Sequence, residues 1–170
     1  DPSAQLPEDD KTKASDKASA AGEVKLEENV EKAPDFTADI AGGGTFKLSE
    51  QKDKIVLLNF WATWCGPCVG EMPAFQRLYE EYGDELSILA VNCVQSKEEV
   101  DAFIKDKGYT FPIAYDPDGE ICSKYPTDGI PYTLVIGKDG TVKKTYLGAD
   151  TAEVQYEEYK AAIEAVKKAK

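Results

Sequence analysis

Phe60–Cys68 reads Phe-Trp-Ala-Thr-Trp-Cys-Gly-Pro-Cys and contains two cysteines separated by two residues. The residues before it, Ile55–Leu58, are continuously apolar, which is typical of a strand covered on both faces. After Cys68, apolar residues recur at helical spacing as far as Tyr82, and Gly83 is placed to end a helix. The sequence therefore predicts a buried strand, a turn carrying both cysteines, and a helix beginning near the second cysteine.

This placement of the two cysteines favours redox chemistry. A thiolate at a helix N-terminus faces unpaired backbone N–H groups and the positive end of the helix dipole. Its pKa is therefore lowered, and the thiolate is the reactive form of cysteine. Since the two side chains can also reach each other, Cys65 and Cys68 are candidates for a redox-active dithiol that closes to a disulfide.

The composition excludes several function classes. The net charge of −12 argues against nucleic acid and anionic membrane surfaces as partners, because both are repelled. The chain has no histidine, which removes the usual general base, metal ligand and pH switch. Arg77 is the only arginine, which argues against a peroxidase with an arginine beside its thiolate. We expect no metal and no cofactor.

The chain divides into two parts. Residues 1–33 are rich in Ser, Ala, Lys, Asp and Glu and poor in large apolar side chains, so we expect a disordered acidic linker, with a short helix at 24–32 as an alternative. Residues 34–170 form the expected domain. Because the chain begins at Asp1 and contains no run of about 18 apolar residues, we expect any signal peptide or anchor to precede it.

The pattern within 34–170 alternates strands and helices after an N-terminal hairpin. This predicts an α/β fold whose mixed sheet has helices on both faces. The expected strands cover residues 35–40, 45–48, 55–60, 86–92, 111–115, 130–136 and 141–147, and the expected helices cover 68–82, 96–108, 120–125 and 150–170.

Two motifs carry a resemblance to a known family. Trp61–Cys68 closely resembles the active-site motif of the thioredoxin superfamily, and Gly-Ile-Pro-Tyr-Thr at Gly129–Thr133 resembles its cis-proline loop. The hairpin, the insertion Ser96–Asp118 and a Glu-Met-Pro after the second cysteine are similar to the TlpA/ResA group of extracytoplasmic oxidoreductases. The resemblance covers residues 34–170. It implies a thioredoxin fold with a central sheet flanked by helices, an N-terminal β-hairpin and a central helix-strand insertion.

The resemblance also implies roles for individual residues. Cys65 would attack a substrate disulfide, Cys68 would resolve the mixed disulfide, and a cis Pro131 would leave the backbone of Ile130 free to pair with substrate. The residues implied to bind substrate are Trp64, Gly66, Pro67 and Ile130.

The sequence departs from the family pattern at two positions. Cytoplasmic thioredoxins carry a buried aspartate where this chain has Asn59, and Gln95 stands where the ResA-like group often has a glutamate. We therefore expect no buried carboxylate behind Cys68, so that its proton would pass to water or to a more remote group such as Glu71. Alternatively, Asn59 and Gln95 are plain hydrogen-bonding residues.

Cys93 and Cys122 leave three interpretations open. Both are expected at the same end of the sheet as the dithiol. In the first interpretation, both cysteines are free, buried and inert. In the second, they form a second disulfide with a structural or relay role. In the third, all four cysteines bind zinc.

The functional expectation is a disulfide reductase that uses protein disulfides as substrates, because Gly66 and Pro67 form the dipeptide of the reducing thioredoxins. The resemblance implies a monomer anchored at the outer face of the cytoplasmic membrane, as a lipoprotein or through an N-terminal anchor, with electrons from a membrane thiol transporter of the CcdA/DsbD type. Cytochrome c maturation, recycling of methionine sulfoxide reductase and maintenance of envelope thiols are the candidate roles. The alternatives are a disulfide oxidase or isomerase, and a redox-silent binding module on the same fold.

Overall fold

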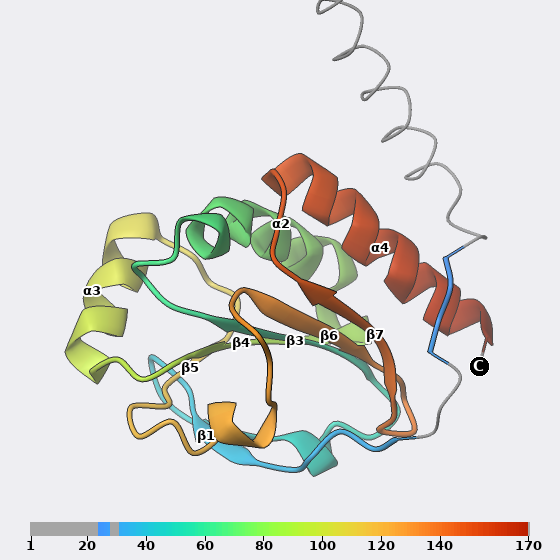
Figure 1. The fold of residues 1–170 in the computed structure, drawn as a ribbon, viewed down its shortest axis with the longest axis horizontal. Helices are drawn as coiled ribbons and strands as arrows, with labels where there is room; N and C mark the ends of the chain where they lie inside the picture. The colour runs from blue at the N-terminus through green and yellow to red at the C-terminus, as the bar shows by residue number, and fades with distance from the viewer. Residues whose placement is uncertain (1–23, 28–30, 170) are drawn as a thin grey trace, which may run out of the picture.

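A five-stranded mixed sheet forms the centre of the fold (Figure 1). The structure is a computed structural model that describes residues 24–27 and 31–169. In the sheet order β5-β4-β3-β6-β7, β3 is parallel to β4 and antiparallel to β6. The mixed α/β architecture expected from the sequence is confirmed. The strands are β3 (Ile55–Trp61), β4 (Leu86–Asn92), β5 (Ile113–Ala114), β6 (Tyr132–Ile136) and β7 (Val142–Leu147).

Three α-helices cover one face of this sheet: α2 (Gly66–Tyr82), α3 (Lys97–Lys107) and α4 (Ala152–Ala169) (Figure 1). Gly83, with a φ of 56°, ends α2 as the sequence predicts. Ser96 and Glu99 form a reciprocal capping box at the start of α3. Within the described residues, no helix combines the length and the apolar character needed to cross a bilayer.

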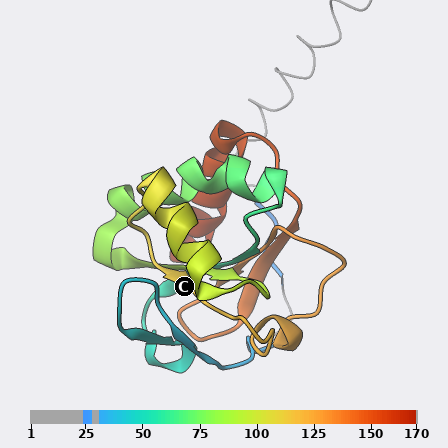
Figure 2. The ribbon, with the colours of Figure 1, turned by 90° about the vertical axis from the view of Figure 1, so that its left-hand side faces the viewer.

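The opposite face of the sheet is covered by shorter elements (Figure 2). They are the hairpin of β1 (Thr37–Asp39) and β2 (Thr45–Lys47), and the 3-10 helices η2 (Leu48–Glu50) and η4 (Cys122–Lys124). The sequence predicts helices on both faces, but this face carries only single turns. One cause is Asp116, whose carboxylate accepts the N–H groups of Ile121 and Cys122 and shapes the turn around η4. A further turn, η3 (Gly83–Glu85), links α2 to β4.

The described part of the N-terminal segment lies along β7. The N–H of Glu27 donates to the carbonyl of Lys143 at 2.6 Å, and the N–H of Val142 donates to the carbonyl of Glu31 at 3.0 Å. Val24 and Leu26 also pack against the core. Residues 24–27 and 31–33 therefore differ from the disordered linker expected there, because the edge strand β7 offers unpaired backbone groups. Residues 24–27 form no helix, and the expectations for 1–23 and 28–30 lie outside the described residues.

Candidate active site

Cys65 and Cys68 lie at the N-terminus of α2, directly after the buried strand β3. Cys65 is the N-cap residue, and the N–H of Cys68 donates to its Sγ at 3.3 Å. The two Sγ atoms form a disulfide, with the Cα atoms 5.2 Å apart. Cys65 is 5% exposed and Cys68 is 1% exposed, so Cys65 is the more accessible of the two. The geometry places the first sulfur where the helix dipole and free N–H groups favour a thiolate.

The loop before β6 borders the disulfide. The peptide bond between Ile130 and Pro131 is cis, and the carbonyl oxygen of Ile130 lies 3.8 Å from the Sγ of Cys65. The N–H of Gly148 donates to the carbonyl of Pro131 at 2.8 Å and so ties this loop to the end of β7. Trp64 stands beside the disulfide with 73% of its surface exposed. The fold therefore brings the two motifs found in the sequence together at one end of the sheet.

A buried carboxylate lies behind the disulfide. Glu71 follows Cys68 by one helical turn on the same face of α2, and its side chain is fully buried. Asn59 Nδ2 donates to Glu71 Oε2 at 3.3 Å, and the hydroxyl of Tyr159 donates to Oε1 at 2.5 Å. Asn59 also donates to Thr133 Oγ1 at 3.0 Å. These side chains come from β3, α2, β6 and α4.

The expectation that no buried carboxylate sits behind Cys68 is therefore wrong. Burial raises the pKa of Glu71 to about 7, and the hydrogen bonds from Tyr159 and Asn59 oppose that rise. A carboxyl group with such a pKa exchanges protons near neutral pH. The sequence contains a signal for it, since Cys68, Glu71 and Met72 follow helical spacing and place Glu71 on the buried face.

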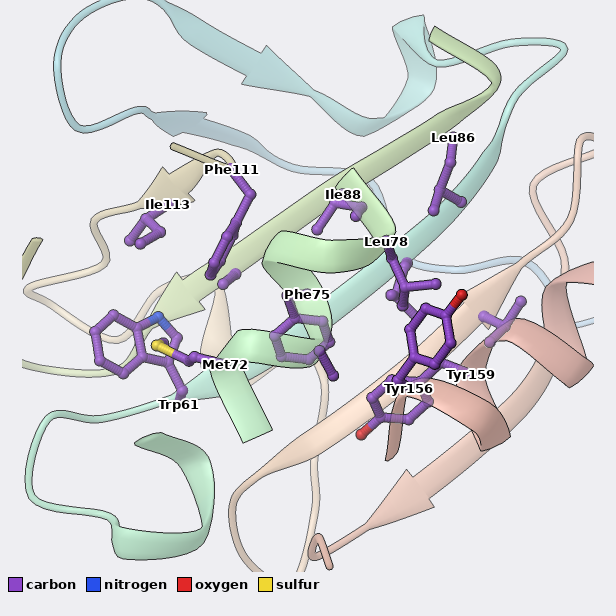
Figure 3. Packing of buried hydrophobic residues seen from close by; sticks show 14 of the residues in the cluster. Trp61, Met72, Phe75, Leu78, Leu86, Ile88, Phe111, Ile113, Tyr156 and Tyr159 are labelled. Atoms are coloured by element: carbon purple, nitrogen blue, oxygen red, sulfur yellow. The ribbon is translucent and has the colours of Figure 1, made fainter. Parts of the chain in front are cut away.

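Tyr159, whose hydroxyl donates to Glu71, lies in an aromatic cluster under the helices (Figure 3). The ring of Tyr159 on α4 stacks on Phe75 of α2, with centroids 5.5 Å apart and planes at 3°. Trp61 and Met72 are also fully buried on this side of the sheet. Glu71 is fully buried, so water has little access to its carboxylate, and desolvation is the main cause of the raised pKa.

Gln95 fixes the loop that leads into the first cysteine. The N–H of Thr63 donates to Gln95 Oε1 at 2.8 Å, and Gln95 Nε2 donates to Thr63 Oγ1 at 2.8 Å. Asn92 Nδ2 also donates to Gln95 Oε1, at 2.9 Å. Gln95 thus serves as a hydrogen-bonding residue of the active-site loop, which agrees with the plainer of the two interpretations of this position.

Cys93 and Cys122 form a second disulfide in the structure, with Cα atoms 6.2 Å apart. Cys93 follows β4, and Cys122 begins η4. Both lie against the hydrophobic cluster on the face opposite the helices, whereas Cys65 and Cys68 belong to the cluster under the helices. Within residues 24–27 and 31–169, no group of three or more Cys, Asp or Glu side chains is arranged to hold a metal ion.

Comparison with known proteins places the chain in a family. Residues 30–145 match the AhpC/TSA family. The chain is 40% identical over 122 residues to the thiol-disulfide oxidoreductase ResA of Geobacillus thermodenitrificans, covering 71% of this chain and 70% of that protein. It is 39% identical over 132 residues to the thioredoxin-like protein YneN of Bacillus subtilis, covering 76% of each.

A solved structure shows the same fold. The exposed lipoprotein thioredoxin Etrx1 of Streptococcus pneumoniae is 29% identical, with a TM-score of 0.66 over 75% of this chain and 98% of that one. The paired cysteines, the cis-proline loop and these similarities agree on one assignment. The chain belongs to the AhpC/TSA family and, with its ResA-like relatives, to the thioredoxin-fold thiol-disulfide oxidoreductases.

Proposed function

We propose that this protein reduces disulfides in other proteins outside the cytoplasm, through the Cys65/Cys68 dithiol. The observation that carries this proposal is the buried Glu71, which has a pKa of about 7 and lies one helical turn after Cys68. A reductase must deprotonate its second cysteine in a buried place, and Glu71 would accept that proton. The Gly66-Pro67 dipeptide, shared with reducing thioredoxins, supports the direction of electron flow.

The reaction has two steps. The Cys65 thiolate attacks one sulfur of the substrate disulfide, which forms a mixed disulfide and releases the other substrate sulfur as a thiolate. Glu71 then takes the proton of the Cys68 thiol, and the Cys68 thiolate attacks Cys65 Sγ. The products are the Cys65–Cys68 disulfide and a fully reduced substrate, and two electrons have passed to the substrate. Substrate backbone would pair beside Ile130 and Pro131 while Trp64, Gly66 and Pro67 contact it.

The setting of the reaction is part of the same proposal. The relative Etrx1 is described as an exposed lipoprotein, which supports an extracytoplasmic, membrane-anchored place for this protein. A membrane thiol transporter of the CcdA/DsbD type would then restore the dithiol, and the protein would act as a monomer.

Arg77 pairs with Glu153 at 3.6 Å and lies over the ring of Tyr156, so it is not placed beside the cysteines as a peroxidase would require.

Turnover assays separate this function from its alternatives. Reduced protein is expected to reduce the interchain disulfides of insulin, and the Cys65→Ala variant is expected to be inactive. Oxidation of a reduced, unfolded protein, or reactivation of scrambled ribonuclease without net reduction, would instead identify an oxidase or an isomerase. Binding of a partner that survives Cys65→Ala, together with no insulin reduction by the intact chain, would identify a redox-silent binding module.

A further inference from the structure

We propose that the Cys93–Cys122 disulfide is a second site of thiol–disulfide exchange, and that its redox state sets the position of the active-site loop. The two disulfides lie at the same end of the sheet, because Cys65 and Cys93 follow the parallel strands β3 and β4. The N–H of Cys93 continues this pairing by donating to the carbonyl of Trp61 at 2.8 Å. The inference extends the proposed function and does not depend on the direction of electron flow at Cys65.

The second disulfide is less deeply buried than the first. Cys93 and Cys122 are both half-buried, in contrast to the buried Cys65 and Cys68. The residues that follow them, Val94 and Ser123, are exposed. Since an attacking thiolate must reach a disulfide sulfur, partial exposure favours reduction in the folded protein.

Val94, the residue after Cys93, has an unusual backbone conformation. It has a φ of 56°, a left-handed conformation that is rare for a β-branched residue. Such conformations persist where surrounding structure enforces them. Here the disulfide fixes the preceding residue, Cys93, and the N–H of Val94 donates to the carbonyl of Asp116 at 3.0 Å. The carboxylate of Asp116 in turn accepts the N–H of Cys122 at 2.9 Å, so Cys122 and the residue after Cys93 are both tied to Asp116.

The connection from this turn to the reactive cysteine is short. Gln95 is the next residue after Val94, and it binds the N–H and the hydroxyl of Thr63 at 2.8 Å each. Thr63 lies two residues before Cys65 in the loop between β3 and α2. Release of the Val94 turn would therefore move Gln95 and loosen the loop that presents Cys65. Gln95 is in this sense a positioning residue.

The structure favours this mechanical coupling over a direct relay between the two disulfides. Cys65 and Cys68 pack in the cluster under the helices, whereas Cys93 and Cys122 pack against the cluster on the other face of the sheet. The backbone of β3 and β4 separates the two clusters. Electrons for the second disulfide must come from outside, and the reductant we propose is a protein dithiol.

The exchange at the second disulfide takes two steps. One thiolate of the reductant attacks a sulfur of the Cys93–Cys122 bond, which breaks it and forms a mixed disulfide. The second thiolate of the reductant then displaces the bound cysteine. Two electrons and two protons reach Cys93 and Cys122, and the reductant leaves as a disulfide.

The first test asks whether the second disulfide forms and is reducible in the folded chain. In a Cys65→Ser/Cys68→Ser variant, maleimide labelling and mass spectrometry report only Cys93 and Cys122. We expect no labelling after oxidation, and labelling of both cysteines in graded dithiothreitol while circular dichroism shows an intact fold. Labelling of the oxidised protein, or labelling only after unfolding, overturns the proposal.

The second test asks whether this bond positions Cys65. In a Cys68→Ser background, the pH profile of Cys65 alkylation by iodoacetamide is compared with and without Cys93→Ser/Cys122→Ser. We expect loss of the bond to shift the profile by about 0.5 pH unit, which is about threefold in thiolate fraction. Gln95→Ala is expected to give the same shift, and the combined variant no further shift, because both changes act through one contact.

The matched control is Gln76→Ala. Gln76 also accepts a backbone N–H, that of Thr110, at 2.9 Å, but it lies farther along α2. In the Cys68→Ser background, adding Gln76→Ala is expected to leave the pH profile of Cys65 alkylation unchanged. Identical profiles with and without Cys93 and Cys122, or additive effects of the two changes, would contradict the coupling. Neither outcome bears on whether Cys65 and Cys68 reduce insulin, so this proposal and the proposed function fail separately.

Discussion

The two disulfides of this protein lie at the same end of the sheet, and each has a buried carboxylate nearby. Glu71, behind Cys65–Cys68, accepts hydrogen bonds from the side chains of Tyr159 and Asn59, and burial raises its pKa to about 7. Asp116, beside Cys122, instead accepts two backbone N–H groups at 3.0 and 2.9 Å. A carboxylate saturated by backbone donors shapes a turn, whereas a desolvated carboxylate near neutral pKa moves protons.

The two bonds also constrain the chain to different extents. Cys65–Cys68 has a sequence separation of 3, at the N-terminus of a helix that would hold both residues in place without the bond. Cys93–Cys122 has a separation of 29 and joins a strand end to a single 3-10 turn across the whole of α3 and β5. The first bond is placed for chemistry on a substrate, and the second is placed to hold two backbone segments together for as long as it stays oxidised.

The largest expected effect separates the bonds by activity. Cys65→Ala is expected to lower insulin reduction more than about a thousandfold, because removal of a nucleophile eliminates the covalent route. Cys93→Ala/Cys122→Ala is expected to stay within about tenfold of the parent rate, since it changes only the position of the loop. Initial rates at matched protein concentration measure both. Equal losses in the two variants would show that the division of roles is wrong.

Loss of the Cys93–Cys122 bond is expected to lower stability more than loss of the Cys65–Cys68 bond, the reverse of the order expected for activity. Closure of a loop of this length predicts that Cys93→Ala/Cys122→Ala lowers the free energy of unfolding by about 3–4 kcal/mol, against about 2 kcal/mol for Cys65→Ala/Cys68→Ala. Urea unfolding under oxidising conditions, with the denaturant slope fitted separately for each variant, provides the measurement. A smaller loss for the Cys93/Cys122 variant than for the Cys65/Cys68 variant contradicts the structural role of the longer bond.

Glu71 is expected to make stability depend on pH. Its folded-state pKa of about 7 lies above the ordinary value of 4.5, so the unfolded chain loses this proton first as pH rises. Its contribution to stability is therefore present below pH 4.5 and falls by about 3 kcal/mol as pH rises through 7. Glu71→Gln should remove this fall in urea unfolding. Glu81→Gln, at a partly exposed position on the same helix, should leave it in place.

Glu71 is also expected to affect catalysis, but less than Cys65 does. Glu71→Gln should slow resolution of the mixed disulfide by about 100-fold, the lower end of the usual range for general base catalysis. The parent rate should rise with pH through about 7 as the carboxylate ionises, and the variant should lack this rise. Stopped-flow measurement of resolution across this pH range tests it. A parallel pH profile in the variant would assign the proton transfer to water.

Much of the fold could be predicted from local sequence. The continuous apolar run of β3, the capping box at Ser96 and the stop at Gly83 each have a local physical cause, and all three appear as expected. The two active-site motifs could also be found, because each is contiguous in sequence. The bond from Glu27 to β7 and the packing of Val24 and Leu26 on the core were missed, since their only signal is the alternation of Val24 and Leu26 in a polar context.

The network around Glu71 shows why the rest of the site could not be predicted. Asn59, Glu71, Thr133 and Tyr159 are scattered over 101 positions of the chain, and only the packing of α4 on α2 brings Tyr159 to the carboxylate. The helical spacing of Glu71 indicates burial but not its partners. Likewise, the left-handed conformation of Val94 depends on Asp116, a contact that local sequence does not indicate.

The midpoint potential of the Cys65–Cys68 couple tests the central claim most directly. It is measured in the Cys93→Ser/Cys122→Ser variant, equilibrated in dithiothreitol and glutathione buffers that span both potentials, with thiol labelling and mass spectrometry to count reduced protein. A reductase with a Gly-Pro dipeptide predicts a value near that of thioredoxin, about −270 mV. A value near that of DsbA, about −120 mV, would make the dithiol an oxidant and contradict the account.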